Sequence, residues 1–97
     1  MSTRITDKHL EGMIARLNRL TNSPMVPYER IDGRCVAQIG NYHLSHAYGG
    51  VCLHRMCSEG GGVTTPLMGG HVTKRELYDQ IYAFIKGIET AQEANRA

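Results

Sequence analysis

The sequence predicts a small α+β fold in which two helices pack on one face of an antiparallel sheet, in the order α-β-β-β(-β)-α. Apolar residues recur at helical spacing near both ends of the chain. In the middle of the chain, the residues that would share a face alternate with the period of two that is typical of strands. The connections between the expected strands are too short for parallel crossovers, so the sheet should be antiparallel. A chain of 97 residues forms one domain, 1–97, which we expect to be ordered from about residue 5 to about residue 90.

The first helix is predicted to begin at Thr6, a good N-cap residue that is followed by the negative charge of Asp7 in the first turn. The helix should end near Asn22, because Ser23 precedes Pro24 and a residue before proline disfavours the helical conformation. Its apolar residues fall on one stripe, which should face the core: Leu10, Met13, Ile14, Leu17 and Leu20.

A β-hairpin is predicted where two strand-like segments, 28–31 and 34–39, flank Asp32-Gly33. This dipeptide suits the positive φ angles of a type I′ turn. In the second strand the apolar side chains share one face, which we expect to be buried: Cys35, Ala37 and Ile39.

Two further strands, one running to Leu44 and one over Val51–Met56, are expected to continue the sheet as a meander of three or four strands. We expect the turn between them at Gly49-Gly50, and we expect the sheet face opposite the helices to be left to water or to a partner. Residues 58–71 form a long irregular segment that is rich in glycine. A loop of this length in a small domain is usually mobile or functional.

The second helix has the strongest signal in the chain. Thr73 to Glu76 form a capping box, so the helix should begin at Thr73, and its polar end should fray beyond Thr90. A second apolar stripe runs along it: Leu77, Ile81, Phe84, Ile85 and Ile88.

Composition excludes several classes of protein. A net charge of +2 is too small to indicate nucleic-acid binding by itself, no segment approaches the ~20 apolar residues of a membrane span, and the N-terminus lacks the apolar core of a signal peptide. The three cysteines are an odd number and too few for a disulfide scaffold, so we expect free thiols in a reducing compartment, the cytoplasm.

One group of polar residues around the central turns has the composition of a nucleotide-like ligand site. The rings of Tyr42 and Tyr48 can stack on a planar base, while Asn41 and His43 can read its edge through hydrogen bonds. The alternative is that both tyrosines are half-buried sheet residues with their hydroxyls outward.

A second group lies at the start of the second helix, where free backbone N–H groups and the positive end of the helix dipole favour an anion. Lys74 and Arg75 stand at this start, His71 precedes it, and Arg55 on a neighbouring strand would join them if the fold brings it close. The alternative is that Lys74 and Arg75 are solvated first-turn charges. In the ligand-binding interpretation, the Gly60–Gly70 loop closes over the ligand.

Metal binding and catalysis are the less favoured interpretations. The candidate metal ligands match no usual zinc spacing, so we expect no metal and no cofactor: His43, His46, Cys52, His54 and Cys57. Cys52 lies near histidines in the sequence, but no pattern orients such a pair or supplies an oxyanion hole. We therefore expect a protein that is not an enzyme and has no catalytic residue.

Four segments carry a resemblance: Ile39-Gly-Asn-Tyr-His-Leu44, Ala47-Tyr-Gly-Gly50, Leu53-His-Arg-Met56 and Gly70-His-Val-Thr-Lys-Arg-Glu-Leu77. On these segments, and loosely from Thr6 to Gly87, the chain resembles a group of small proteins of tailed bacteriophages and prophages. The resemblance implies an accessory protein in the host cell cytoplasm, such as a counter-defence factor. It transfers no catalytic residue. The α-β-β-β-α order is also similar to that of double-stranded RNA-binding domains, but only in topology.

Three functions follow from these observations. The preferred one is a homo-oligomeric binder that sequesters a nucleotide-like small molecule. A second is an inhibitor or adaptor that binds a host protein, which predicts an exposed apolar sheet face and no enclosed pocket. A third is a nucleic-acid-binding accessory protein, whose affinity would fall steeply with added salt.

Overall fold

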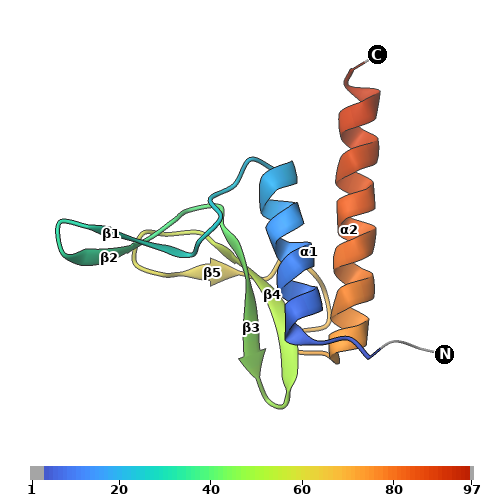
Figure 1. The fold of residues 1–97 in the computed structure, drawn as a ribbon, viewed down its shortest axis with the longest axis horizontal. Helices are drawn as coiled ribbons and strands as arrows, with labels where there is room; N and C mark the ends of the chain where they lie inside the picture. The colour runs from blue at the N-terminus through green and yellow to red at the C-terminus, as the bar shows by residue number, and fades with distance from the viewer. Residues whose placement is uncertain (1–3, 97) are drawn as a thin grey trace.

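The computed structural model describes residues 4–96 and contains two helices and two small antiparallel sheets, which confirms the predicted α+β class. The molecule is flat, with extents of 48 × 43 × 21 Å. None of the helices within residues 4–96 is long and apolar enough to cross a membrane. Along the chain the elements are α1 Asp7–Leu20, β1 Tyr28–Ile31, β2 Arg34–Ala37, β3 Tyr42–Ala47, β4 Gly50–Met56, β5 Val63–Thr64 and α2 Lys74–Ala94 (Figure 1).

The helix α1 begins as predicted, with Thr6 as its N-cap. The Thr6 side chain accepts a hydrogen bond from the backbone of His9, and the His9 ring accepts one in return from the Thr6 backbone N–H, at 3.0 Å. This reciprocal capping satisfies two of the donors that a helix start leaves free. Within the predicted stripe, Leu10, Ile14 and Leu17 are buried, which fixes the face that α1 turns to the core.

The hairpin predicted around Asp32-Gly33 is present, with φ angles of 50° and 77° at the two turn residues. Strands β1 and β2 form a sheet of their own, the β1–β2 arm, which extends away from the helices in Figure 1. The predicted burial of one face of β2 is correct only for Ala37, because Cys35 and Ile39 are exposed.

The second sheet has the order β3-β4-β5, so the single meander expected from the sequence is wrong. The chain leaves β2 at Ala37 and turns through Gly40, whose φ is 95°, before β3 begins. The tight turn between β3 and β4 consists of Tyr48 and Gly49 rather than Gly49 and Gly50, with φ angles of 54° and 73°. Strand β5, inside the segment that we expected to be irregular, pairs with the end of β4.

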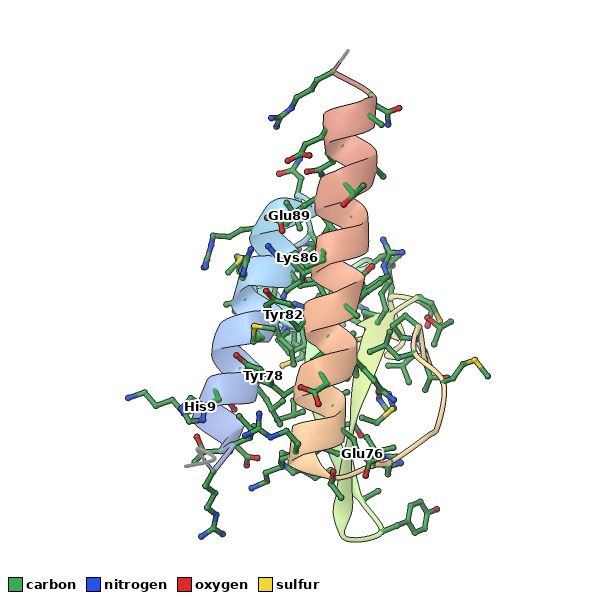
Figure 2. All side chains as sticks on the ribbon, turned by 90° about the vertical axis from the view of Figure 1, so that its right-hand side faces the viewer. His9, Glu76, Tyr78, Tyr82, Lys86 and Glu89 are labelled. Carbon is green, nitrogen blue, oxygen red and sulfur yellow. The ribbon has the colours of Figure 1, made fainter. Side chains whose placement is uncertain are left out.

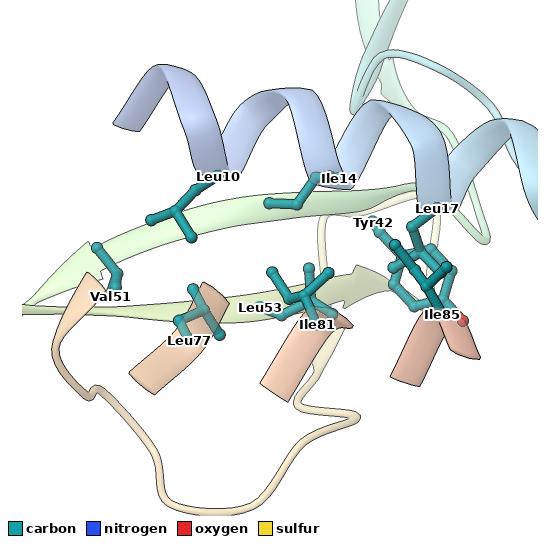
Figure 3. Close-up of a cluster of buried hydrophobic side chains, with 9 residues drawn as sticks. All are labelled: Leu10, Ile14, Leu17, Tyr42, Val51, Leu53, Leu77, Ile81 and Ile85. Atoms are coloured by element: carbon teal, nitrogen blue, oxygen red, sulfur yellow. The ribbon is translucent and has the colours of Figure 1, made fainter. Parts of the chain in front are cut away.

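Both helices pack on one face of β3 and β4, as predicted, and they enclose one hydrophobic core between them. Figure 3 shows this core, to which α1, the two strands and α2 each contribute three side chains. Its members are Leu10, Ile14, Leu17, Tyr42, Val51, Leu53, Leu77, Ile81 and Ile85. Burying nine side chains of this kind contributes about 1.5–3 kcal/mol each before chain entropy is subtracted.

The second helix is longer than the sequence suggested. It is capped by Thr73 as predicted, but it continues past Thr90 to Ala94. The Gln92 amide donates to the backbone oxygen of Leu20 at 3.1 Å, which ties this last part of α2 to the end of α1. Glu89, which lies beside α1 in Figure 2, forms an ion pair with Arg16 of α1 at 3.1 Å.

Candidate functional site

Polar side chains with metal-binding and acid-base chemistry gather on the far face of β3 and β4, which we define as the face turned away from the helices. His43 pairs with His54 and Ser45 pairs with Cys52 across the two strands. Directly paired residues of an antiparallel sheet point to the same side, and their neighbours Tyr42 and Leu53 occupy the core side. The far face therefore carries two histidines, a thiol and a hydroxyl as one block.

The chain segment before α2 brings a third histidine to this block. The backbones of Val51 and Val72 exchange two hydrogen bonds of 2.8 Å, which fasten the end of the segment beside β4. His71 thereby reaches the far face, where its Nε2 lies 3.4 Å from Ser45 Oγ. His71 thus lies on part of the far face, which the sequence led us to expect would be left to water or to a partner.

Cys52, His54 and His71 form what we call the Cys-His-His cluster. Their Sγ and ring nitrogen atoms all lie within 4.8 Å of one another. The His54 and His71 rings meet edge to face, with centroids 6.2 Å apart, and His43 stands against the other side of His54 at 5.8 Å. The side chain of Cys52 is buried, whereas the histidines are half-buried.

Burial favours the neutral forms of Cys52, His43 and His54. It raises the pKa of the Cys52 thiol, and it lowers the pKa of His43 and of His54 below the usual value of 6.5. Neighbouring imidazoles add to the effect on the two pKa values, His54 acting on His43 and His71 on His54. At neutral pH His43 and His54 therefore carry free lone pairs, which suit a metal ion or a hydrogen-bond donor.

Two residues of the predicted ligand site are part of the structural framework. Asn41 is fully buried; its amide nitrogen donates to the Pro24 carbonyl at 2.8 Å, and its oxygen lies 3.2 Å from His43 Nδ1. Tyr42 lies in the core, with its ring edge to face against Phe84. Neither side chain is free to contact a base, so the stacking role predicted for Tyr42 and the readout role predicted for Asn41 are wrong.

Tyr48 and His71 do lie together, with ring centroids 5.7 Å apart. Tyr48 is 97 % exposed at the tip of the β3–β4 turn, so one side of its ring is available to a partner. His43, by contrast, stands beside the cluster and is separated from Tyr48 by most of β3. The predicted set is therefore divided between the tip and the middle of the sheet.

The predicted basic residues are also separated. Lys74 pairs with Asp7 of α1 at 3.2 Å, and the Arg75 guanidinium lies 5.9 Å from the centre of the Tyr78 ring. Arg55 lies near one end of β4, whereas Val51, which pairs with Val72 just before α2, lies near the other end. The Arg55 guanidinium lies over the Tyr42 ring, 5.1 Å from its centre. Arg55 therefore does not join the two residues at the start of α2, as the sequence interpretation required.

Of the metal ligands considered from the sequence, Cys52 and His54 come together, while His46 pairs with Asp7 at 3.1 Å and Cys57 is exposed beyond β4. The sequence interpretation missed His71 as their companion. The available signal was the position of His71 between Gly69-Gly70 and a helix start. Such a position does not indicate which part of the sheet the side chain will contact. The comparisons with protein-family models, curated proteins and solved structures found no match.

Proposed function

We propose that this protein is a non-enzymatic adaptor or inhibitor that binds another protein through the β1–β2 arm. The observation that carries the proposal is the concentration of exposed apolar side chains in and beside the arm. Each of the following is between 45 % and 56 % exposed: Met25, Val26, Tyr28, Ile31 and Ile39. Exposed apolar side chains that gather in one part of a molecule are typical of a contact site for a partner.

The arm also presents an open strand edge. Within residues 4–96, strand β1 pairs with β2 alone, so its other edge carries backbone groups without a strand partner. An isolated hairpin is only marginally stable in water, and an open edge is a template for an extended segment of another protein. The partner that fits is therefore an extended segment with apolar side chains. If the resemblance to phage proteins holds, the partner belongs to the host cell.

A catalytic function is less well supported. The one cysteine that lies among histidines, Cys52, is 2 % exposed, and burial raises the pKa of its thiol. A nucleophilic cysteine needs the reverse, an accessible thiol whose pKa is lowered. These properties suit a binding protein better than a cysteine-dependent enzyme.

The test uses the full-length protein and arm variants. Ile31→Arg and Val26→Ser place polar groups on the arm and directly beside it, and Tyr82→Ser removes a side chain of similar exposure, 46 %, from α2 as a matched control. Proteins captured from host lysate are identified, purified and titrated against each variant. We expect saturable binding that both arm variants weaken by at least tenfold and that Tyr82→Ser leaves unchanged. The proposal fails if no purified partner shows this dependence on the arm.

A nucleotide-like small ligand remains the second candidate, because a depression of about 300 Å³ opens beside the start of α2, with His46 and Lys74 in its lining. This volume is at the lower limit of usual ligand pockets, which begin at about 300 Å³. Native mass spectrometry of the protein isolated from its host tests this candidate. A released mass of nucleotide size that is present with Lys8→Ala and absent with Lys74→Ala would favour the small-ligand function. A ligand-free mass of the unmodified protein would exclude this function.

A further inference from the structure

The three ligand atoms of the Cys-His-His cluster already lie close to the spacing of a metal site. Tetrahedral zinc holds sulfur and nitrogen at about 2.3 Å and 2.0 Å, so the ligand atoms of one thiolate and two imidazoles are about 3.3–3.6 Å apart. The three ligand atoms of Cys52, His54 and His71 already lie within 4.8 Å of one another. Zinc binding would draw the three ligand atoms closer together through rotation of their side chains.

We propose that Cys52, His54 and His71 bind one zinc ion, with three protein ligands and a fourth position open to water or to a partner's donor atom. The donor set selects the metal. One thiolate and two imidazoles match a borderline-soft ion such as zinc, whereas magnesium and calcium require oxygen ligands. Binding replaces the thiol proton of Cys52 by the metal, so one proton is released for each ion bound.

The backbone holds all three ligands in place. Cys52 and His54 are two residues apart on β4 and therefore project from the same face of a paired strand. His71 is held by the two hydrogen bonds between Val51 and Val72, and its Nε2 is within 3.4 Å of the Ser45 hydroxyl. Two of the three ligands thus lie on a paired strand, where side chains are positioned more accurately than on free loops, which favours metal binding.

The surroundings also match those of a metal site. The His43 ring packs edge to face against His54, and its own Nδ1 lies 3.2 Å from Asn41 Oδ1. The packing against His43 restricts rotation of the His54 ring. The Ser45 hydroxyl lies within hydrogen-bonding reach of His71, as the outer partners of metal-ligating imidazoles do. This proposal does not depend on the function of the β1–β2 arm, because the two sites occupy separate sheets.

The test measures metal binding directly on the untagged full-length protein, kept reduced and freed of metal with a chelator. Zinc affinity comes from competition with a chromophoric chelator, and cobalt(II) serves as the spectroscopic probe. We expect one equivalent of either ion to bind, with the absorption of a thiolate-to-cobalt charge transfer and of tetrahedral cobalt. Cys52→Ser should remove the charge-transfer band, and His71→Ala should lower zinc affinity by more than about tenfold.

Matched controls separate this site from other thiols and histidines. Cys35→Ser removes an exposed thiol of the arm, and His46→Ala removes a histidine of β3 that pairs with Asp7. Both should bind zinc as the unmodified protein does. The proposal is overturned if the unmodified protein binds no stoichiometric zinc, or if Cys52→Ser and His71→Ala bind it unchanged. His71→Ala keeps the test decisive if Cys52→Ser fails to fold, because His71 lies outside the helices and named strands.

Discussion

At the scale of single residues, Asn18 is a buried polar side chain that connects α1 to β3 through hydrogen bonds. It is 1 % exposed, donates to the Tyr42 carbonyl at 3.0 Å and accepts from the Tyr42 N–H at 2.9 Å. Asn18 thus satisfies both backbone groups of Tyr42 at a point where, within residues 4–96, β3 has no neighbouring strand on that side. The side chain takes the place of a strand partner.

Replacing Asn18 by alanine should therefore lower the free energy of unfolding strongly. Two buried backbone groups of Tyr42 lose their partners, and each costs about 1–3 kcal/mol, which gives a loss of about 2–6 kcal/mol. Urea unfolding monitored by circular dichroism measures it. Arg19→Ala, at the next and exposed position of α1, should change the free energy of unfolding by less than about 0.5 kcal/mol. Equal effects of the two substitutions would contradict this role of Asn18.

Gly50 illustrates a different constraint, the close approach of two chain segments. A Cβ atom at Gly50 would lie 2.9 Å from the Val72 oxygen and 3.1 Å from the backbone carbon of His71. Gly50→Ala should therefore cost about 1–3 kcal/mol of unfolding free energy, as overpacking usually does. It should also displace His71 from the Cys-His-His cluster.

Gly12 provides the matched comparison. It lies inside α1, and a Cβ atom there meets nothing within 4 Å. Gly12→Ala should stabilise the protein by about 0.5–1 kcal/mol, because alanine is the better helix former. Urea unfolding of both variants tests the pair, and a stabilising Gly50→Ala would show that the contact with Val72 is not tight.

At the scale of elements, Asp7 joins the start of α1 to β3 and α2. The Lys74 ammonium, 3.2 Å away, and then His46 lower the pKa of Asp7 below its usual 3.8. A carboxyl group whose pKa is lowered by folding stabilises the native state above the pKa of the unfolded chain, about 3.9. That stabilisation is lost as pH falls through the lower, folded-state pKa.

Asp7→Asn should accordingly lower the melting temperature at pH 7, and the difference from the unmodified protein should disappear as pH falls below about 3.9. Thermal unfolding between pH 7 and pH 2.5 measures the difference. Glu11→Gln makes the same change of charge on an exposed position of α1 and should have a smaller effect at pH 7. A difference that persists unchanged at the lowest pH would rule out the ionised carboxylate as its cause.

The elements also show what the sequence alone could predict. Caps and apolar periods are local, so Thr6, Thr73 and the two helical stripes were enough to predict both helices and the face each buries. The division into two sheets was not predictable in this way, because strands on both sides of Gly40 have the same alternating pattern. Nor was the length of α2, whose last turns are held by the long-range contact between Gln92 and Leu20.

The same distinction applies to the candidate sites. The strand period places Cys52 and His54 on one face of β4, so this half of the cluster was readable from the sequence. His71 reaches it only because Val72 pairs with Val51, a contact between segments that no periodicity predicts. Tyr42 and Asn41 were assigned to a ligand because their polar atoms suit one. Burial decides that role, and burial depends on which face of β3 the helices cover.

At the scale of the whole molecule, one zinc ion would join the segment before α2 to the sheet. The ligands Cys52 and His54 belong to β4, and His71 belongs to the segment between β5 and α2. An ion that binds only the folded state stabilises it by mass action, by about 2.7 kcal/mol when its free concentration is 100 times Kd. In a domain of this size, each kcal/mol raises the melting temperature by about 4–8 °C.

Zinc should therefore raise the melting temperature of the metal-free protein by about 10–20 °C at 100 times Kd. It should also slow amide hydrogen exchange in residues 57–72 more than in the β1–β2 arm, because the arm lies in the other sheet. Cys52→Ser should respond to zinc in neither measurement, whereas Cys35→Ser should respond fully. If zinc protected the arm and residues 57–72 equally from exchange, it would stabilise the molecule without linking the segment to β4. That result would contradict the proposed site.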